Sequence, residues 1–281
     1  MTTGIESSRS SFCSFRPYRP GRSQGHCTVP TPRSTDAVVR DICRHLKDHG
    51  SAEHAAGAQR YFKEQVRSRG WYTADLRRYA RALHKDLGGD QARLLDVAES
   101  LFARPVLEEK ATAVCMVQPS LRHFGNPEFR RFERWLDAVA SWADHDALAM
   151  YLLGPMIEAE PSRVESPVTW AASPNRWRRR AAAVSLIHGI RRGAFAREAT
   201  AITSQLLFDR DDMVQKGLGW LLREWAKYHP AEAVPVLLRI RDTAPRMVLR
   251  TGCEKLGATD RRRILGRSRG RRDSGSGTRD S

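Results

Sequence analysis

The stretch VQKGLGWLLREWAKY, residues 214–228, decides the fold class. Its apolar side chains recur at the spacing i, i+4, i+7, i+8 and i+11, which at 100° per residue places them on one side of a helix. This spacing is typical of a helix that packs one face against a core. The residues expected on that buried face are Val214, Leu218, Leu221, Leu222 and Trp225.

The opposite side of the same helix carries one tryptophan among three cations. Lys216, Trp220, Arg223 and Lys227 follow the spacing i, i+4, i+7 and i+11 and are expected to point away from the core. A Trp among cations suits a surface that meets a polyanion and a flat or apolar group within it. The pattern therefore predicts a nucleic-acid partner.

The charge of the whole chain agrees with such a partner. The net charge is +16, of which residues 1–35 contribute +4 and residues 258–281 contribute +5, so that +7 remains on residues 36–257. A folded body of that charge favours phosphate-rich partners through counterion release. An arginine-rich proteome would give the same balance without any nucleic acid, so the charge alone leaves both interpretations open.

The central part of the chain is helical in pattern. Amphipathic segments of ordinary helix length alternate with short turns, and no stretch shows the period-2 alternation of a β-sheet. We therefore expect an all-α protein, an α-solenoid of antiparallel HEAT-like helix pairs with a curved, basic, concave face. Helix starts are expected at Thr73, Asn126-Pro127, Ser173-Pro174, Asp211-Asp212 and His229-Pro230.

The predicted domain organisation has three parts. Residues 1–33 are rich in Ser, Arg, Pro and Gly without any period, and residues 258–281 are rich in Arg, Ser and Gly. Both are expected to be disordered basic tails. The helical-repeat domain is expected to span residues 34–257.

Several classes of protein are disfavoured. The five cysteines are odd in number and widely spaced without a C-x-x-C pair, so no disulfide framework is expected. His45 and His49 lack the glutamate of a zincin motif, and neither a P-loop nor a G-x-G-x-x-G occurs. We expect a cytoplasmic protein, associated with the nucleoid when bound to DNA, that uses no metal, nucleotide or other cofactor and does not enter membranes.

The segment SWADHDALAMYLLG, which begins at Ser141, carries the first candidate for chemistry. Trp142 and Asp146 lie one helical turn apart on one face, so a carboxylate stands beside an aromatic wall. Such a pair suits a developing positive charge, for example the oxocarbenium-like sugar formed when an N-glycosidic bond breaks. The alternative is that Asp144 and Asp146 are first-turn acids that complement the helix dipole.

The segment NRWRRRAAAVSLIHGI, from Asn175, carries the second candidate. Arg180 shares the apolar face of this helix, whereas Arg178 and Arg179 point elsewhere. An arginine that leans inward needs a partner, because an unpaired buried charge is costly. Asp146 or a DNA phosphate would serve, and a structural salt bridge between neighbouring helices is an equal alternative.

A third segment combines aromatic and basic residues. Tyr61 and Lys63 lie in YFKEQ, shortly before the aromatic pair Trp71-Tyr72. These side chains could hold a nucleic-acid backbone. Aromatic residues at helical spacing more often belong to a core, so this segment alone decides nothing.

Four segments in order resemble the AlkD-like DNA alkylation-repair glycosylases, a family built of HEAT-like repeats. VQKGLGWLLREWAK at 214–227 is similar to the family's Q-K-A-x-G-W-x-L-R-E motif, the most specific of the four. The others are RYFKEQ with TADLRRYAR (60–65 and 73–81), SWADHD (141–146) and NRWRRRAA (175–182). The resemblance covers most of residues 36–257.

The resemblance implies a monofunctional glycosylase that excises N-alkylated purines, such as 3-methyladenine and 7-methylguanine, from double-stranded DNA without a deep base pocket. By matching position, Asp146 is the catalytic carboxylate and Trp142 and Trp220 form an aromatic pair against the lesion nucleotide. Arg180 is the cation near that cleft, and Tyr61 contacts the backbone. Further expected DNA contacts are Lys63, Arg178, Arg179, Lys216, Arg223 and Lys227.

Departures from the family pattern concern the carboxylate, the helix at 214–228 and the extra cations Arg178 and Arg179. The family usually has W-D-x-x-D, whereas this chain has Ala143 at the first acid and an acid at Asp144. Asp144 would lie about 200° around the helix from Asp146 and away from Trp142, so Asp146 is preferred as the working residue. Gly217 also differs from the family pattern.

Three functions are therefore carried forward from the sequence. The first is a DNA glycosylase for alkylated purines that acts as a monomer. The second is a non-catalytic protein that binds branched or distorted DNA with the same basic face, and the third is a helical scaffold for proteins.

Overall fold

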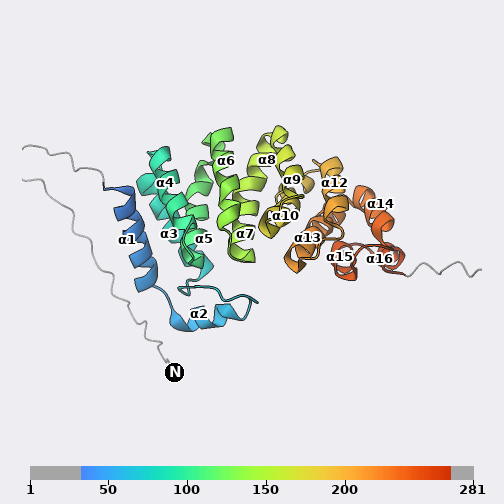
Figure 1. Ribbon diagram of the computed structural model, residues 1–281, viewed down its shortest axis with the longest axis horizontal. Helices are drawn as coiled ribbons and strands as arrows, with labels where there is room; N and C mark the ends of the chain where they lie inside the picture. Colours follow the sequence, from blue (N-terminus) through green and yellow to red (C-terminus); the bar gives the residue numbers. More distant parts are fainter. Residues whose placement is uncertain (1–32, 267–281) are drawn as a thin grey trace, which may run out of the picture. The chain divides into compact units, whose positions relative to one another are not determined.

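The computed structural model describes residues 33–266, and the regular secondary structure of this part of the chain is helical. No β-strand occurs within it, and the only bridge there is an isolated one between Arg67 and Val106. The helices follow one another side by side, from α1 to α16 (Figure 1). The prediction of an all-α protein of the α-solenoid type is confirmed.

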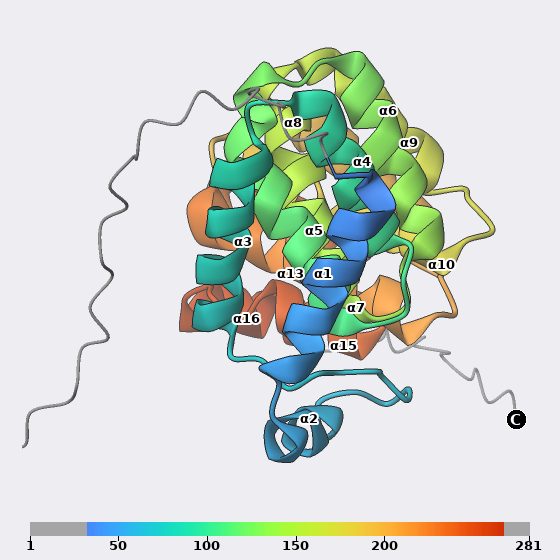
Figure 2. The same cartoon turned by 90° about the vertical axis from the view of Figure 1, so that its left-hand side faces the viewer.

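The first helices pack against one another as neighbours. α1 contacts α4, α3 and α4 contact α5, and α5 contacts α7. α2 lies beyond the ends of α1 and α3, with an irregular segment that leads back to α3 (Figure 2). The bounds are α1 (Thr35–Asp48), α2 (Ala52–Gln59), α3 (Thr73–Leu87), α4 (Gln91–Phe102), α5 (Leu107–Val117) and α6 (Asn126–Trp135).

The middle and last helices continue the stack. α10 packs between α9 and α13, and α13 packs against α15. α7 passes through a π-helical turn (Ala149–Leu153) directly into α8. The bounds are α7 (Trp142–Leu148), α8 (Gly154–Ala159), α9 (Glu165–Trp170), α10 (Arg176–Val184), α11 (Ile187–Ile190), α12 (Ala196–Leu206), α13 (Asp212–Tyr228), α14 (Pro230–Ile240), α15 (Arg246–Gly252) and α16 (Ala258–Leu265).

α13 forms as its sequence predicts. The carboxylate of Asp211 caps it by accepting hydrogen bonds from the backbone amides of Met213 and Val214. All five residues of the predicted apolar face are buried. The lack of a side chain at Gly217 lets the stem of Arg180 pass beneath the helix, since a Cβ there would lie 3.0 Å from Arg180 Cγ.

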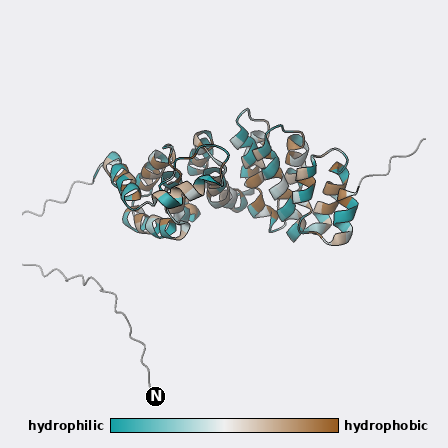
Figure 3. Ribbon diagram, turned by 90° about the horizontal axis from the view of Figure 1, so that it is seen from below, coloured by the Kyte–Doolittle hydropathy of each residue, from teal (hydrophilic) through white to brown (hydrophobic). Residues whose placement is uncertain are grey.

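Other helix starts agree with the sequence within a few residues. α3, α6 and α14 begin at or within one residue of the predicted positions. α10 begins later than Ser173-Pro174, because the side chain of Asn175 caps it by accepting from the Trp177 amide at 2.9 Å. Hydrophilic and hydrophobic residues alternate along the helices (Figure 3).

The predicted domain boundaries need one correction. Residues 258–265 form helix α16, where a disordered tail was expected from 258 onward. Ile264 is buried, and α16 packs on α14 and α15, so an apolar anchor outweighs the arginine-rich composition. The remainder of that tail, and the predicted N-terminal arm apart from Arg33, lie outside the described residues.

Within residues 33–266, no helix has the length and apolar character needed to cross a membrane. The same residues contain no group of three or more His, Cys, Asp or Glu side chains that could hold a metal ion.

Candidate active site

Asp144, one of the two candidate carboxylates, caps the start of α7. Its side chain accepts hydrogen bonds from the backbone amides of Ala140 and Ser141, each at 2.8 Å, and from the Ser141 hydroxyl. The residue is 1% exposed. It therefore serves as the N-terminal capping acid that was one alternative for this segment.

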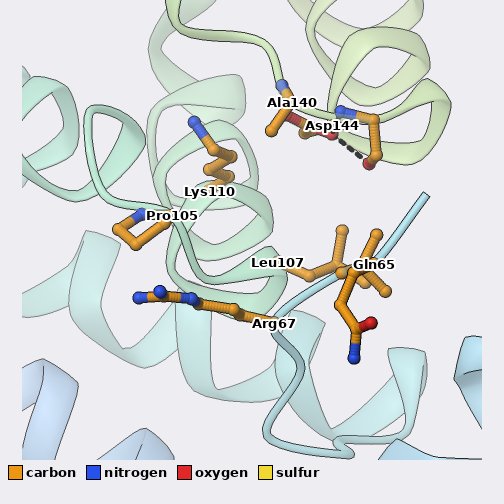
Figure 4. A pocket seen from close by; sticks show the side chains of 9 residues that line it. Gln65, Arg67, Pro105, Leu107, Lys110, Ala140 and Asp144 are labelled. Atoms are coloured by element: carbon orange, nitrogen blue, oxygen red, sulfur yellow. Dashed lines mark hydrogen bonds between the residues drawn. The ribbon is translucent and has the colours of Figure 1, made fainter.

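Asp144 also faces a small pocket of about 160 Å³ between α5, α7 and residues 65–67 (Figure 4). Lys110 lines the same pocket, and its ammonium donates to the carbonyls of Phe102 and Ala138 at 2.6 Å each. Burial lowers the pKa of Lys110. Neither Trp142 nor Asp146 lines this pocket, so the two carboxylates belong to separate environments.

Asp146 binds Arg180 in a two-point ion pair. Arg180 Nε donates to Asp146 Oδ1 at 3.0 Å and Nη2 donates to Oδ2 at 2.9 Å. Arg180 Nη1 also donates to the carbonyl of Met213 on α13 at 2.6 Å. The inward-leaning arginine of α10 thus has the carboxylate partner that the sequence proposed for it, and the pair ties α7, α10 and α13 together.

The ion pair keeps Asp146 charged. Burial alone would raise the pKa of Asp146, but the hydrogen bond with His145 and the charge of Arg180 together hold the pKa below its usual value. The side chain of Asp146 retains 20% exposure, whereas that of Arg180 retains 6%. The carboxylate is therefore ionised at neutral pH and is the more accessible member of the pair.

His145, which was not among the predicted residues, completes the group around Asp146. It is fully buried, with Nδ1 2.7 Å from Asp146 Oδ1 and Nε2 3.1 Å from the carbonyl of Trp177. Its ring also stacks on the Trp177 indole, with centroids 5.5 Å apart. The only signal for His145 in the sequence is its place between two aspartates, in DHD. Periodicity does not show which neighbouring helix its ring contacts.

Several of the predicted site residues line a second pocket, of about 260 Å³. Its lining residues come from α7, α10, α13 and the segment after α2; they are Tyr61, Lys63, Trp142, Arg180, Met213 and Lys216. Residues far apart in the sequence thus meet around the outer side of Arg180. We call this space the Trp142 pocket.

The segment that follows α2 forms one wall of the Trp142 pocket. The ring of Phe62 stacks on that of Trp142, with centroids 5.1 Å apart, and Tyr61 is 79% exposed. Lys63 and Lys216 both bind the carboxylate of Asp212, at 2.7 and 3.2 Å. Two cations therefore share one exposed acid at the mouth of the pocket, which leaves an excess of positive charge there.

Trp220 does not join Trp142 in this pocket. It is partly exposed on α13, one turn beyond Lys216, but it is not among the lining residues. The aromatic contact on Trp142 comes instead from Phe62. The predicted pairing of Trp142 with Trp220 against a nucleotide therefore stays a prediction about the DNA complex.

Arg178 and Arg179 are held by acids of the same protein. Arg178 binds Asp137 through two hydrogen bonds of 2.8 Å, and Arg179 binds Asp209 at 2.6 Å. Arg179 also donates to two backbone carbonyls before α10. Both guanidinium groups are thus occupied, and their predicted contacts with DNA would require these ion pairs to open.

The last two predicted DNA-binding cations, Arg223 and Lys227, differ in whether acids of the protein already bind them. Arg223 lies within 3.4 Å of Glu224 and 3.5 Å of Glu254, whereas Lys227 is exposed beside the hydroxyl of Tyr228. Neither lines the Trp142 pocket. Their role in DNA binding stays a prediction, and Lys227 is the freer of the two.

Arg176 is a further residue that the sequence did not single out. It binds Glu64 at 3.0 Å and Asp211 at 3.3 Å, and it lies over the ring of Trp177. It therefore joins the segment after α2 to the start of α13. With the Lys63–Asp212 pair, it fixes the wall of the Trp142 pocket from two sides.

A buried glutamate anchors the return of that segment to α3. Glu108 accepts hydrogen bonds from the Ser68 hydroxyl at 2.7 Å and from the amides of Arg69 and Gly70 at 2.7 and 2.9 Å. Gly70 has φ of +74°, and a Cβ there would collide with the Ser51 carbonyl. Glu108 thus holds the sharp turn by which this segment returns to α3.

Replacing Glu108 with alanine should lower the free energy of unfolding by about 3 kcal/mol, because several buried donors lose a charged acceptor. Amide hydrogen exchange at Arg69 and Gly70 should become faster. Glu53→Ala, at an exposed acid of α2, is the matched control and should cost less than about 1 kcal/mol. Equal stability of the two variants in urea denaturation would contradict the anchoring role.

Comparison with known proteins agrees with this architecture. The family model described as DNA alkylation repair enzyme matches residues 42–256. The chain belongs to the DNA alkylation repair enzyme family. The match includes all the residues that line the Trp142 pocket, together with Asp146 and His145.

A solved structure supports the fold of this DNA alkylation repair family member. The chain is similar to a predicted DNA alkylation repair enzyme from Enterococcus faecalis, with a TM-score of 0.68 and 18% sequence identity. The similarity covers 74% of this chain and 97% of that one. No curated protein matches the chain. Membership of the family implies DNA as the partner.

Proposed function

We propose that the protein is a monofunctional DNA glycosylase that hydrolyses the N-glycosidic bond of alkylated purines in duplex DNA. The substrates would be of the 3-methyladenine and 7-methylguanine type. The observation that carries the proposal is the ionised Asp146, paired with Arg180, an arginine that itself lines the Trp142 pocket together with Trp142, Lys63 and Lys216.

The chemistry needs little beyond electrostatic stabilisation. An N-alkylated purine is already cationic, so it leaves as a neutral base and the positive charge passes to the deoxyribose. A fixed carboxylate lowers the energy of that oxocarbenium-like sugar, and its pre-set position costs no reorganisation during the reaction. Water then attacks C1′ and forms the abasic sugar.

The other residues of the pocket would position the DNA. Lys63 and Lys216 share Asp212, so an arriving phosphate can bind either ammonium without leaving the acid unpaired. The flat face of Trp142, backed by Phe62, would pack against the deoxyribose or base of the lesion. The exposed ring of Tyr61 would lie against the backbone.

Release of free base from methylated duplex DNA tests the proposal. The full-length protein is incubated with DNA treated with a methylating agent, and the released bases are separated by chromatography. We expect 7-methylguanine or 3-methyladenine to appear in proportion to time and enzyme, with no release of guanine or adenine from the same DNA. No release of an alkylated base would contradict the glycosylase proposal.

One observation favours a second function, a non-catalytic protein that binds branched or distorted DNA. Both oxygens of Asp146 are engaged by Arg180, and Asp146 is not among the residues that line the Trp142 pocket. This function predicts tight, salt-dependent binding of junction or bulged DNA with no released base. Fluorescence anisotropy over a salt series, run beside the release assay, separates the two functions.

A further inference from the structure

His145 makes two short polar contacts that constrain its protons. Nε2 faces the carbonyl oxygen of Trp177, which accepts hydrogen bonds and has no hydrogen to give. Nδ1 faces Oδ1 of Asp146 at 2.7 Å. A neutral imidazole carries one N–H, so it satisfies only one of these two contacts.

Both contacts are hydrogen bonds only when the His145–Asp146 pair carries one additional proton. With that proton, Nε2–H donates to Trp177 and a hydrogen lies between Nδ1 and Oδ1. Without it, a lone pair of one ring nitrogen faces a lone pair of the oxygen opposite, at one of the two buried contacts. Such an arrangement costs free energy, and buried polar groups generally avoid it. Arg180 Nε, at 3.2 Å from Nδ1 and 3.0 Å from Oδ1, has a single hydrogen and offsets only part of that cost.

From this geometry we propose that His145 stores the proton of Asp146, so that the two residues act as one acceptor for the proton of the attacking water. The inference rests on the proposed function for its catalytic part. Asp146 would touch the reacting water, and His145 is a positioning residue that acts through it.

The step balances as a simple hydrolysis. The C1′–N bond breaks and its electrons leave with the alkylated purine, which departs as a neutral base. The water oxygen forms a bond to C1′, and one water proton passes to the Asp146 carboxylate. That proton is then held between Asp146 Oδ1 and His145 Nδ1 until it returns to solvent.

The surroundings weaken the hold of His145 on this proton. Burial lowers the pKa of His145, Asp146 opposes that effect, and the positive charge of Arg180 adds to it. The other charged group that acts on His145 is Asp144 on the same helix; α10 contributes the Trp177 carbonyl and Arg180. A pair that holds the proton weakly can pass it on to solvent after the reaction.

Nuclear magnetic resonance of the full-length chain tests the proton count without DNA. In ¹⁵N-labelled protein, His145 should show a protonated Nε2 at neutral pH and should gain a proton at Nδ1 in one step on acidification, below the pH at which an ordinary histidine titrates. The Asp146 carboxyl carbon should shift in the same step, because the proton belongs to the pair. An imidazole whose Nε2 is unprotonated, or that gains no proton while folded, would overturn the proposal.

The pH dependence of base release tests the catalytic part. Below the apparent pKa of the pair, the rate of 7-methylguanine release should fall about tenfold per pH unit and level off above it. His145→Asn retains an amide that can donate to Asp146 but holds no titratable proton, so the step should move to the lower pH at which Asp146 titrates alone. His188→Asn, at a partly exposed histidine that binds Glu158, is the matched control and should keep the wild-type profile.

The outcomes separate the two proposals. A folded His145→Asn variant with an unchanged pH profile would overturn the role of His145 while leaving the glycosylase proposal intact. If the wild-type protein releases no base, the glycosylase proposal fails. The magnetic resonance titration then still decides whether the pair holds the proton. Circular dichroism of the variants at each pH confirms that rates are compared between folded proteins.

Discussion

Replacing Asp146 with asparagine should lower the rate of 7-methylguanine release by about a hundredfold or more. The amide is isosteric and can still accept from Arg180, but it carries no negative charge to oppose the charge that develops on the sugar. It also cannot take the proton of the attacking water. The measurement is single-turnover release from methylated duplex DNA with the enzyme in excess.

Asp137→Asn is the matched control for this prediction. Asp137 also binds an arginine of α10, in a two-point contact with Arg178, but Arg178 does not line the Trp142 pocket, and Asp137 is more exposed than Asp146. Its loss should leave the release rate within about twofold of wild type. Equal release by wild type and Asp146→Asn would show that Asp146 is not the working carboxylate, and thermal denaturation shows whether each variant is folded.

The fold was predictable because it depends on periodicity within single segments. The buried face of α13 follows from the spacing of its apolar residues, and the inward position of Arg180 follows from the face that it shares with Trp177. The helix of residues 258–265 was missed because one buried residue, Ile264, decides it within a run dominated by arginine. A prediction from the composition of the segment gives a single apolar residue little weight, whereas the packing of the helix depends on that residue.

The site was predictable in its centre and less so at its edges. Trp142 and Asp146 are one turn apart on one helix, so spacing places them together. Asp146 was proposed as a partner for Arg180, 34 residues away, because Arg180 shares the apolar face of its own helix. The partners of Arg178 and Arg179 are Asp137 and Asp209, which lie 41 and 30 residues away in sequence. No local pattern encodes a pairing of that separation, and the contact of His145 with the Trp177 carbonyl is of the same kind.

Replacing Arg180 with alanine should have the largest effect on stability. The variant leaves Asp146 without its cation, frees the Met213 carbonyl and removes the stem that packs under Gly217. Breaking one partner of a buried ion pair typically costs about 3–5 kcal/mol. Arg178→Ala, on the same helix with a more exposed partner, should cost about 1 kcal/mol or less. Urea denaturation followed by circular dichroism measures both.

A double-mutant cycle separates the charge of Arg180 from its packing. Arg180→Met keeps the length of the apolar stem but leaves Asp146 unpaired, so it should be nearly as destabilising as Arg180→Ala. Adding Asp146→Asn should restore part of the loss, because no uncompensated buried charge then remains. Strict additivity of the two substitutions would mean that solvent screens the pair. That result would remove the argument that Asp146 is held ionised in a fixed position for the reaction.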